Sequence, residues 1–73
     1  MIEIGKVGRI TAGDDTGRFV RIDELPDAPP SYLVLLARDP AFLDGCGDDW
    51  VENREGLDDY FAEARWGVEW ISP

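Results

Sequence analysis

The sequence contains no histidine and only one cysteine, Cys46. Without histidine, the chain lacks the side chain that most often acts as a general base or a metal ligand near neutral pH. One cysteine excludes an internal disulfide bond, which a secreted domain of this size usually needs, so we expect a reducing, cytoplasmic environment. Met1–Gly5 lacks the basic and long apolar segments of a signal peptide. The most apolar run, Tyr32–Ala37, is far shorter than the roughly 20 residues of a membrane-spanning helix.

Basic residues are also scarce, because 7 lysines and arginines are set against 16 aspartates and glutamates, for a formal charge of −9. The imbalance lies in the second half of the chain. Residues 1–38 contain six acids and five bases, whereas residues 39–73 contain ten acids and two bases. Such a chain is unsuited to binding nucleic acid through its phosphates, and anionic membranes repel it. A basic protein partner would be attracted to it.

Three segments before residue 40 predict strands. Apolar residues over Ile2–Ile10 predict a first strand that is bent or bulged near Gly5 and Gly8, where the alternation slips. Phe19–Ile22 alternates apolar and basic residues and predicts a second strand, paired with the first as a hairpin. The apolar run Tyr32–Ala37 predicts a central strand that is buried on both faces.

The segments between these strands have the composition of turns and loops. Ala12–Gly17 is rich in aspartate and glycine and predicts a turn. Asp23–Ser31 contains three prolines and predicts an ordered surface crossing. Ala41–Trp50 predicts an irregular loop with one short turn at its start.

A capped amphipathic helix follows. Asn53 is the preferred N-cap, and Asp49 is the alternative because Glu52 would complete a capping box. Starting at Asp49 would place Gly56 inside the helix, at a cost of about 1 kcal/mol relative to alanine. Gly67 is expected as the left-handed residue that ends the helix. The side chains that share the core-facing stripe are Leu57, Tyr60, Phe61 and Ala64.

Val68–Ile71 alternates as a last strand, with Val68 and Trp70 on the core side. The predicted order is β-β-β-α-β, in a small α+β fold with the helix packed on one face of a mostly antiparallel sheet. We expect one domain, residues 1–73, with a thin core that depends on a few large side chains.

We find no set of residues that predicts catalysis or a cofactor. Cys46 lies in a predicted loop between glycines, and its acidic neighbours disfavour the thiolate that a nucleophile needs. Asp14 and Asp15 are adjacent in a turn, and Asp58 and Asp59 are adjacent on the helix. In neither pair can the two carboxylates face each other across a cleft, as the mechanism of a glycosidase requires.

A calcium loop is the metal site that the sequence comes nearest to. Asp44, Asp48 and Glu55 match the first, fifth and last positions of an EF-hand loop. Cys46 occupies a ligand position, and Asp49 stands where the loop needs glycine. We therefore expect a solvated acidic segment and no metal.

An acidic stripe is the strongest candidate for function. Glu52, Glu55, Asp59 and Glu63 share the helix side opposite the core stripe. Like charges four residues apart are destabilising by a few tenths of a kcal/mol each. A basic partner would relieve that repulsion, whereas the simpler interpretation is a solvated helix face. Trp50, beside Asp48 and Asp49, is expected to be partly exposed, as an interface anchor would be.

The run Asp48–Asn53 (Asp-Asp-Trp-Val-Glu-Asn), followed by Leu57, Tyr60-Phe61 and Trp66–Trp70, resembles small acidic bacterial immunity proteins. These accompany polymorphic or contact-dependent toxins and block a cognate toxin, often a basic nuclease, without catalysis. The resemblance implies a non-enzymatic inhibitor of a basic protein partner. We call the following residues the predicted binding set: Asp48, Asp49, Trp50, Glu52, Glu55, Asp59 and Glu63.

The same residues are compatible with two other classes of function. A phage-encoded mimic of nucleic acid, such as an anti-CRISPR or anti-restriction protein, would have the same size and charge, and the genome neighbourhood would separate it from an immunity protein. A structural module that forms a homodimer through a sheet edge would be recognised by sedimentation.

Overall fold

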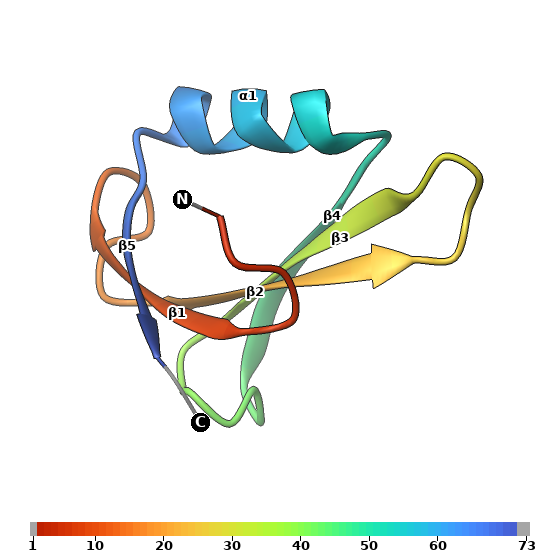
Figure 1. Cartoon of the computed structure of the whole chain (residues 1–73). Helices are drawn as coiled ribbons and strands as arrows, with labels where there is room; N and C mark the ends of the chain where they lie inside the picture. Colours follow the sequence, from red (N-terminus) through yellow and green to blue (C-terminus); the bar gives the residue numbers. More distant parts are fainter. Residues whose placement is uncertain (1, 72–73) are drawn as a thin grey trace.

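Five antiparallel strands form one open sheet, and one helix crosses a single face of it, within residues 2–71, the part that the computed structural model describes (Figure 1). The strands lie in the order β4-β3-β2-β1-β5, so β1 pairs with both β2 and β5. The expected α+β class is confirmed. The elements are β1 (Val7–Ala12), β2 (Phe19–Leu25), β3 (Ser31–Ala37), β4 (Gly45–Val51), α1 (Arg54–Ala64) and β5 (Gly67–Ile71).

The strand register divides the sheet into a face covered by α1 and an open face. Ile22 of β2 lies opposite Val34 of β3, and both are buried in one cluster with Leu57 of α1. Because successive side chains of a strand point to opposite faces, Arg21 and Leu33 lie on the open face. The core cluster consists of Ile10, Val20, Ile22, Tyr32, Val34 and Leu57.

The prediction of an irregular loop over Ala41–Trp50 is wrong, because Gly45–Val51 forms β4 along the outer side of β3. Glycine and aspartate are rare in strands, but pairing with β3 overrides that local preference. The preceding turn is closed by the Asp39 carboxylate, which accepts hydrogen bonds from the N–H groups of Leu43 (3.1 Å) and Asp44 (2.8 Å). These backbone donors lower the pKa of Asp39. The element order is therefore β-β-β-β-α-β, not β-β-β-α-β.

The first strand begins later than predicted, at Val7. Gly5 has a φ of 78°, which suits a turn, so Ile2 and Ile4 pack against the core from an irregular N-terminal segment. The predicted bend is therefore present at Gly5. It is absent at Gly8, which lies in regular register with both neighbouring strands.

Two predictions for the middle of the chain need correction. The surface crossing predicted over Asp23–Ser31 is a shorter hairpin loop, because β2 runs to Leu25 and β3 begins at Ser31. The strand β3 is second from an edge, and β2 is the central strand. Leu33 and Leu35 are only half-buried, so β3 is not buried on both faces. The reason is that the single helix covers one face of the sheet.

The helix α1 begins after Asn53 and ends at Arg65. Asn53 is the N-cap as predicted, and its side-chain oxygen accepts a hydrogen bond from the N–H of Gly56 at 2.8 Å. Leu57 is the helix residue that is fully buried. The left-handed residue at the C-terminal end is Arg65, with a φ of 56°, and not Gly67. Gly67 opens β5, where an added Cβ would lie 3.3 Å from the Cβ of Ala12.

Aromatic rings join α1 to β5. Phe61 contacts Trp66 edge-to-face, with ring centroids 5.0 Å apart, and stacks on Trp70 at 6.4 Å. Val68 and Trp70 pack against the core, as the alternation of this strand predicts. The helix is therefore connected to both edge strands of the sheet. It follows β4 in the chain, and the aromatic rings pack it against β5.

Candidate functional site

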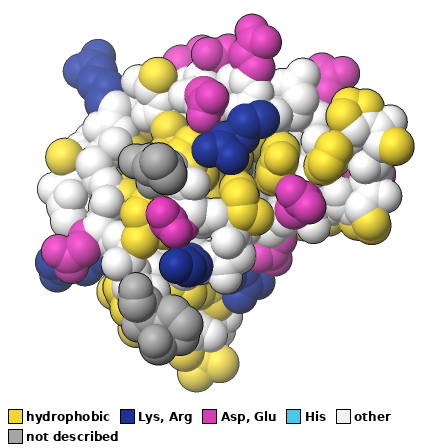
Figure 2. All heavy atoms as spheres, viewed as in Figure 1, with side chains coloured by type: hydrophobic (Ala, Val, Ile, Leu, Met, Phe, Trp, Pro, Cys, Tyr) yellow, Lys and Arg dark blue, Asp and Glu magenta, His cyan; other side chains and the backbone are white. Residues whose placement is uncertain are grey.

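The predicted binding set lies on two connected elements. Asp48, Asp49 and Trp50 are in β4, Glu52 is in the connection to α1, and the other members lie at four-residue intervals along the helix. All seven residues are exposed. Figure 2 shows acidic side chains along the edge of the molecule over α1.

The strand alternation sends the members of β4 in two directions. Asp49 lies opposite Val34 and therefore faces the side of the helix. Asp48 and Trp50 lie opposite Leu35 and Leu33 and face the open side of the sheet. The structure thus places Asp49 beside the acidic residues of α1 and separates Asp48 and Trp50 from them. Trp50 is 59% exposed, which confirms the expected exposure.

The ion pairs of the chain leave this set without internal partners. Among residues 2–71, six of the seven basic side chains pair with acids outside the set, and Arg65 forms no ion pair in that range. The surplus negative charge is therefore concentrated on β4, α1 and their connection. The pairs are Lys6–Glu3, Arg9–Glu69, Arg18–Asp15, Arg21–Asp23, Arg38–Asp44 and Arg54–Asp58.

One hydrogen bond ties the two acidic elements together. The Tyr60 hydroxyl donates to Asp49 Oδ2 at 2.7 Å, from α1 to β4. Burial raises the pKa of Tyr60, and the hydrogen bond to Asp49 raises it further, because both favour the protonated phenol. Tyr60 therefore remains a donor at neutral pH and holds Asp49 against the helix.

The fold adds two acids that sequence reasoning left out of the site. Asp14 and Asp15, in the turn between β1 and β2, line a pocket of about 310 Å³ next to the C-terminal half of α1. Their sequence context indicated only a turn, and no local spacing connects them to a helix that begins forty residues later. The other lining residues are Tyr60, Glu63, Ala64 and Trp66.

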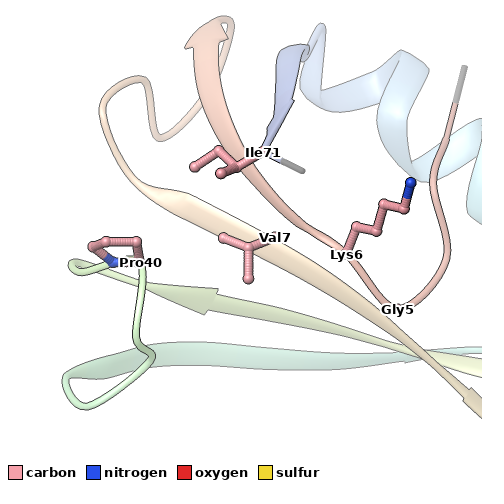
Figure 3. Close-up of a pocket in the computed structure, with 5 residues that line it drawn as sticks. All are labelled: Gly5, Lys6, Val7, Pro40 and Ile71. Carbon is pink, nitrogen blue, oxygen red and sulfur yellow. The ribbon is translucent and has the colours of Figure 1, made fainter. Parts of the chain in front are cut away.

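A second pocket, of about 260 Å³, has a different character (Figure 3). Val7, Pro40 and Ile71 supply apolar walls, and Gly5 and Lys6 complete the lining. The Lys6 side chain extends away from the three apolar residues, and its Nζ is 3.4 Å from a Glu3 carboxylate oxygen. This lining contains no pair of groups suited to acid–base chemistry.

Cys46 lies half-buried in β4, not in a loop. Among residues 2–71, no three or more histidine, cysteine, aspartate or glutamate side chains are grouped so that they could hold a metal ion. The helix of the described region is too short and too polar to cross a membrane. Neither a scan against protein-family models nor searches of curated proteins and of solved structures found a match for this chain.

Proposed function

We propose that this chain is a non-catalytic inhibitor that binds a basic protein partner and covers its functional surface, as the small acidic immunity proteins do. The observation that carries the proposal is the pattern of ion pairs. Six basic side chains pair with other acids, and the six acids of the predicted binding set have no basic partner within residues 2–71.

The free protein retains like-charge repulsion along α1. Glu55, Asp59 and Glu63 follow one another at four-residue spacing and are exposed. Each such contact is destabilising by about 0.2–0.5 kcal/mol. Lysine or arginine side chains of a partner would replace this repulsion with attraction, and the same field would accelerate association.

Trp50 would act as an apolar anchor at the border of this surface. It is more than half exposed at the edge strand of the sheet, where a contacting partner could bury it. Because Trp50 and the helix acids face different sides of β4, a partner that contacts both must cover the β4 edge.

The test uses two charge-reversed proteins with equal net charge. Glu55→Lys combined with Asp59→Lys alters the proposed surface, and Asp44→Lys combined with Glu69→Lys is the control. The two control sites belong to exposed ion pairs, which are typically worth about 1 kcal/mol or less. Urea unfolding first establishes that both variants fold.

Each protein is used to capture partners from a lysate of the source organism at low salt, and the captured protein is then purified. We expect a basic protein whose association with the surface variant at low salt is slower by about tenfold or more, with the control close to wild type. A partner that associates equally fast with all three proteins, or whose function survives saturating binding, would refute the proposal.

A further inference from the structure

The pocket between the β1–β2 turn and α1 has aromatic walls. Tyr60 and Trp66 contribute rings whose centroids are 5.5 Å apart at an interplanar angle of 61°. The turn is fastened to the helix end by two hydrogen bonds. The Trp66 indole N–H donates to the Asp14 carbonyl at 2.7 Å, and the Asp14 N–H donates to the Ala64 carbonyl at 2.9 Å. The pocket is therefore formed before any ligand arrives.

The side-chain donors of this lining are already in use. Tyr60 donates its hydroxyl proton to Asp49, and Trp66 donates its indole proton to the turn. Within residues 2–71, the carboxylates of Asp14 and Glu63 accept no side-chain hydrogen bond and form no ion pair. What the lining side chains offer a ligand is thus aromatic surface and free acceptors.

The negative charge of the pocket lining further restricts the kind of ligand that can bind. Asp14, Asp15 and Glu63 carry three negative charges, of which Arg18 balances one through its contact with Asp15 at 3.1 Å. A neutral ligand would find no donor among these side chains, and an anion would be repelled. A planar guanidinium group fits best, because it presents only donors, stacks on aromatic faces and is less strongly hydrated than an ammonium.

We propose that this pocket binds the side chain of an arginine from the partner, with the guanidinium between the aromatic rings and the carboxylates of Asp14 and Glu63. The inference rests on the proposed function and extends it, since it names a contact on the basic partner. It also places the β1–β2 turn, which precedes α1 by forty residues, in the binding surface.

The probe is N-acetyl-arginine amide, titrated into the ¹⁵N-labelled protein by NMR. The Trp66 indole signal reports on the pocket, and the indole signals of Trp50 and Trp70 are internal references. N-acetyl-lysine amide and N-acetyl-glutamine amide are titrated in parallel. We expect a saturable shift of the Trp66 signal with the arginine probe, a weaker response with lysine and none with glutamine.

Two matched variants test the carboxylates. Glu63→Gln removes a charge from the pocket rim, whereas Glu24→Gln removes one from an exposed position of β2, outside the pocket and outside the predicted binding set. We expect Glu63→Gln to weaken the affinity for the arginine probe at least threefold and Glu24→Gln to leave that affinity within twofold of wild type. Equal responses to the three probes, no saturable Trp66 shift, or equal affinity in the two variants would overturn the inference.

The two proposals fail separately. If the arginine probe binds as expected but the captured partner ignores Glu55→Lys with Asp59→Lys, the proposed function is wrong and the pocket assignment stands. If the partner depends on that double variant but the probe does not bind at Trp66, the pocket assignment alone is wrong.

Discussion

Replacing Gly8 with alanine should disrupt the contact between β1 and β5. Gly8 lies opposite Trp70 and is buried under its ring. A Cβ at this position would lie 2.4 Å from Cγ1 of Val68 and 2.8 Å from the Trp70 ring. Carbon atoms in contact lie about 3.5–4.0 Å apart. Trp70 and Val68 would therefore have to move by about 1 Å.

The size of the effect follows from two opposing contributions. Over-packing of this kind costs about 1–3 kcal/mol. Alanine also removes chain entropy from the unfolded state, which favours the folded protein by about 0.5–1 kcal/mol. We expect a net loss of about 0.5–2 kcal/mol, against a total stability of about 4–11 kcal/mol for a chain of this length.

Gly47→Ala is the matched control, because it is also a glycine-to-alanine change in a strand. Its added Cβ would meet the Leu36 side chain at 3.8 Å, an ordinary contact. Urea unfolding followed by tryptophan fluorescence gives the midpoint and slope for each protein. We expect a lower midpoint for Gly8→Ala than for Gly47→Ala, with similar slopes. Equal midpoints would refute the packing of Trp70 over β1.

The other predictions concern α1. Leu57→Ala removes the fully buried helix side chain and should lower the free energy of unfolding by about 2–5 kcal/mol, measured by urea titration. Asn53→Ala removes the N-cap and should lower the free energy of unfolding by about 1 kcal/mol. An unchanged free energy would mean that the hydrogen bond from Gly56 to Asn53 is not made in solution. The pKa of Tyr60 is raised in the folded protein above its ordinary value of 10.0. Tyr60 therefore contributes its full stabilisation of the folded state below pH 10, and this contribution is lost as the pH rises above 10. Compared with the wild type, Tyr60→Phe should therefore show a smaller loss of stability above pH 10, in thermal melts at several pH values.

The helix could be predicted because its signals are local. The Asn53 side chain bonds a backbone group three residues along, and the stripe that contains Leu57 repeats within single turns. The acidic character of the chain and its separation into two halves likewise depend only on composition. The exposure of Trp50 followed from its acidic neighbours, and the core position of Trp70 from alternation.

Other features depend on residues far apart in the chain. Strand β4 has the composition of a loop, and only its pairing with β3 makes it a strand. From the sequence, Gly8 suggested a bend. In the structure, glycine is required at this position because the Trp70 ring packs where a Cβ would lie.

Tertiary contacts also pair groups that are far apart in the chain. Arg9 pairs with Glu69 across two strands, and the turn at Asp14 is bonded to Trp66, 52 residues away. Composition and short-range periodicity therefore determined the helix, the net charge and the amphipathic pattern. The edge strand and the aromatic pocket arise only when distant segments are brought together, because each is made of groups that have no contact until the chain has folded.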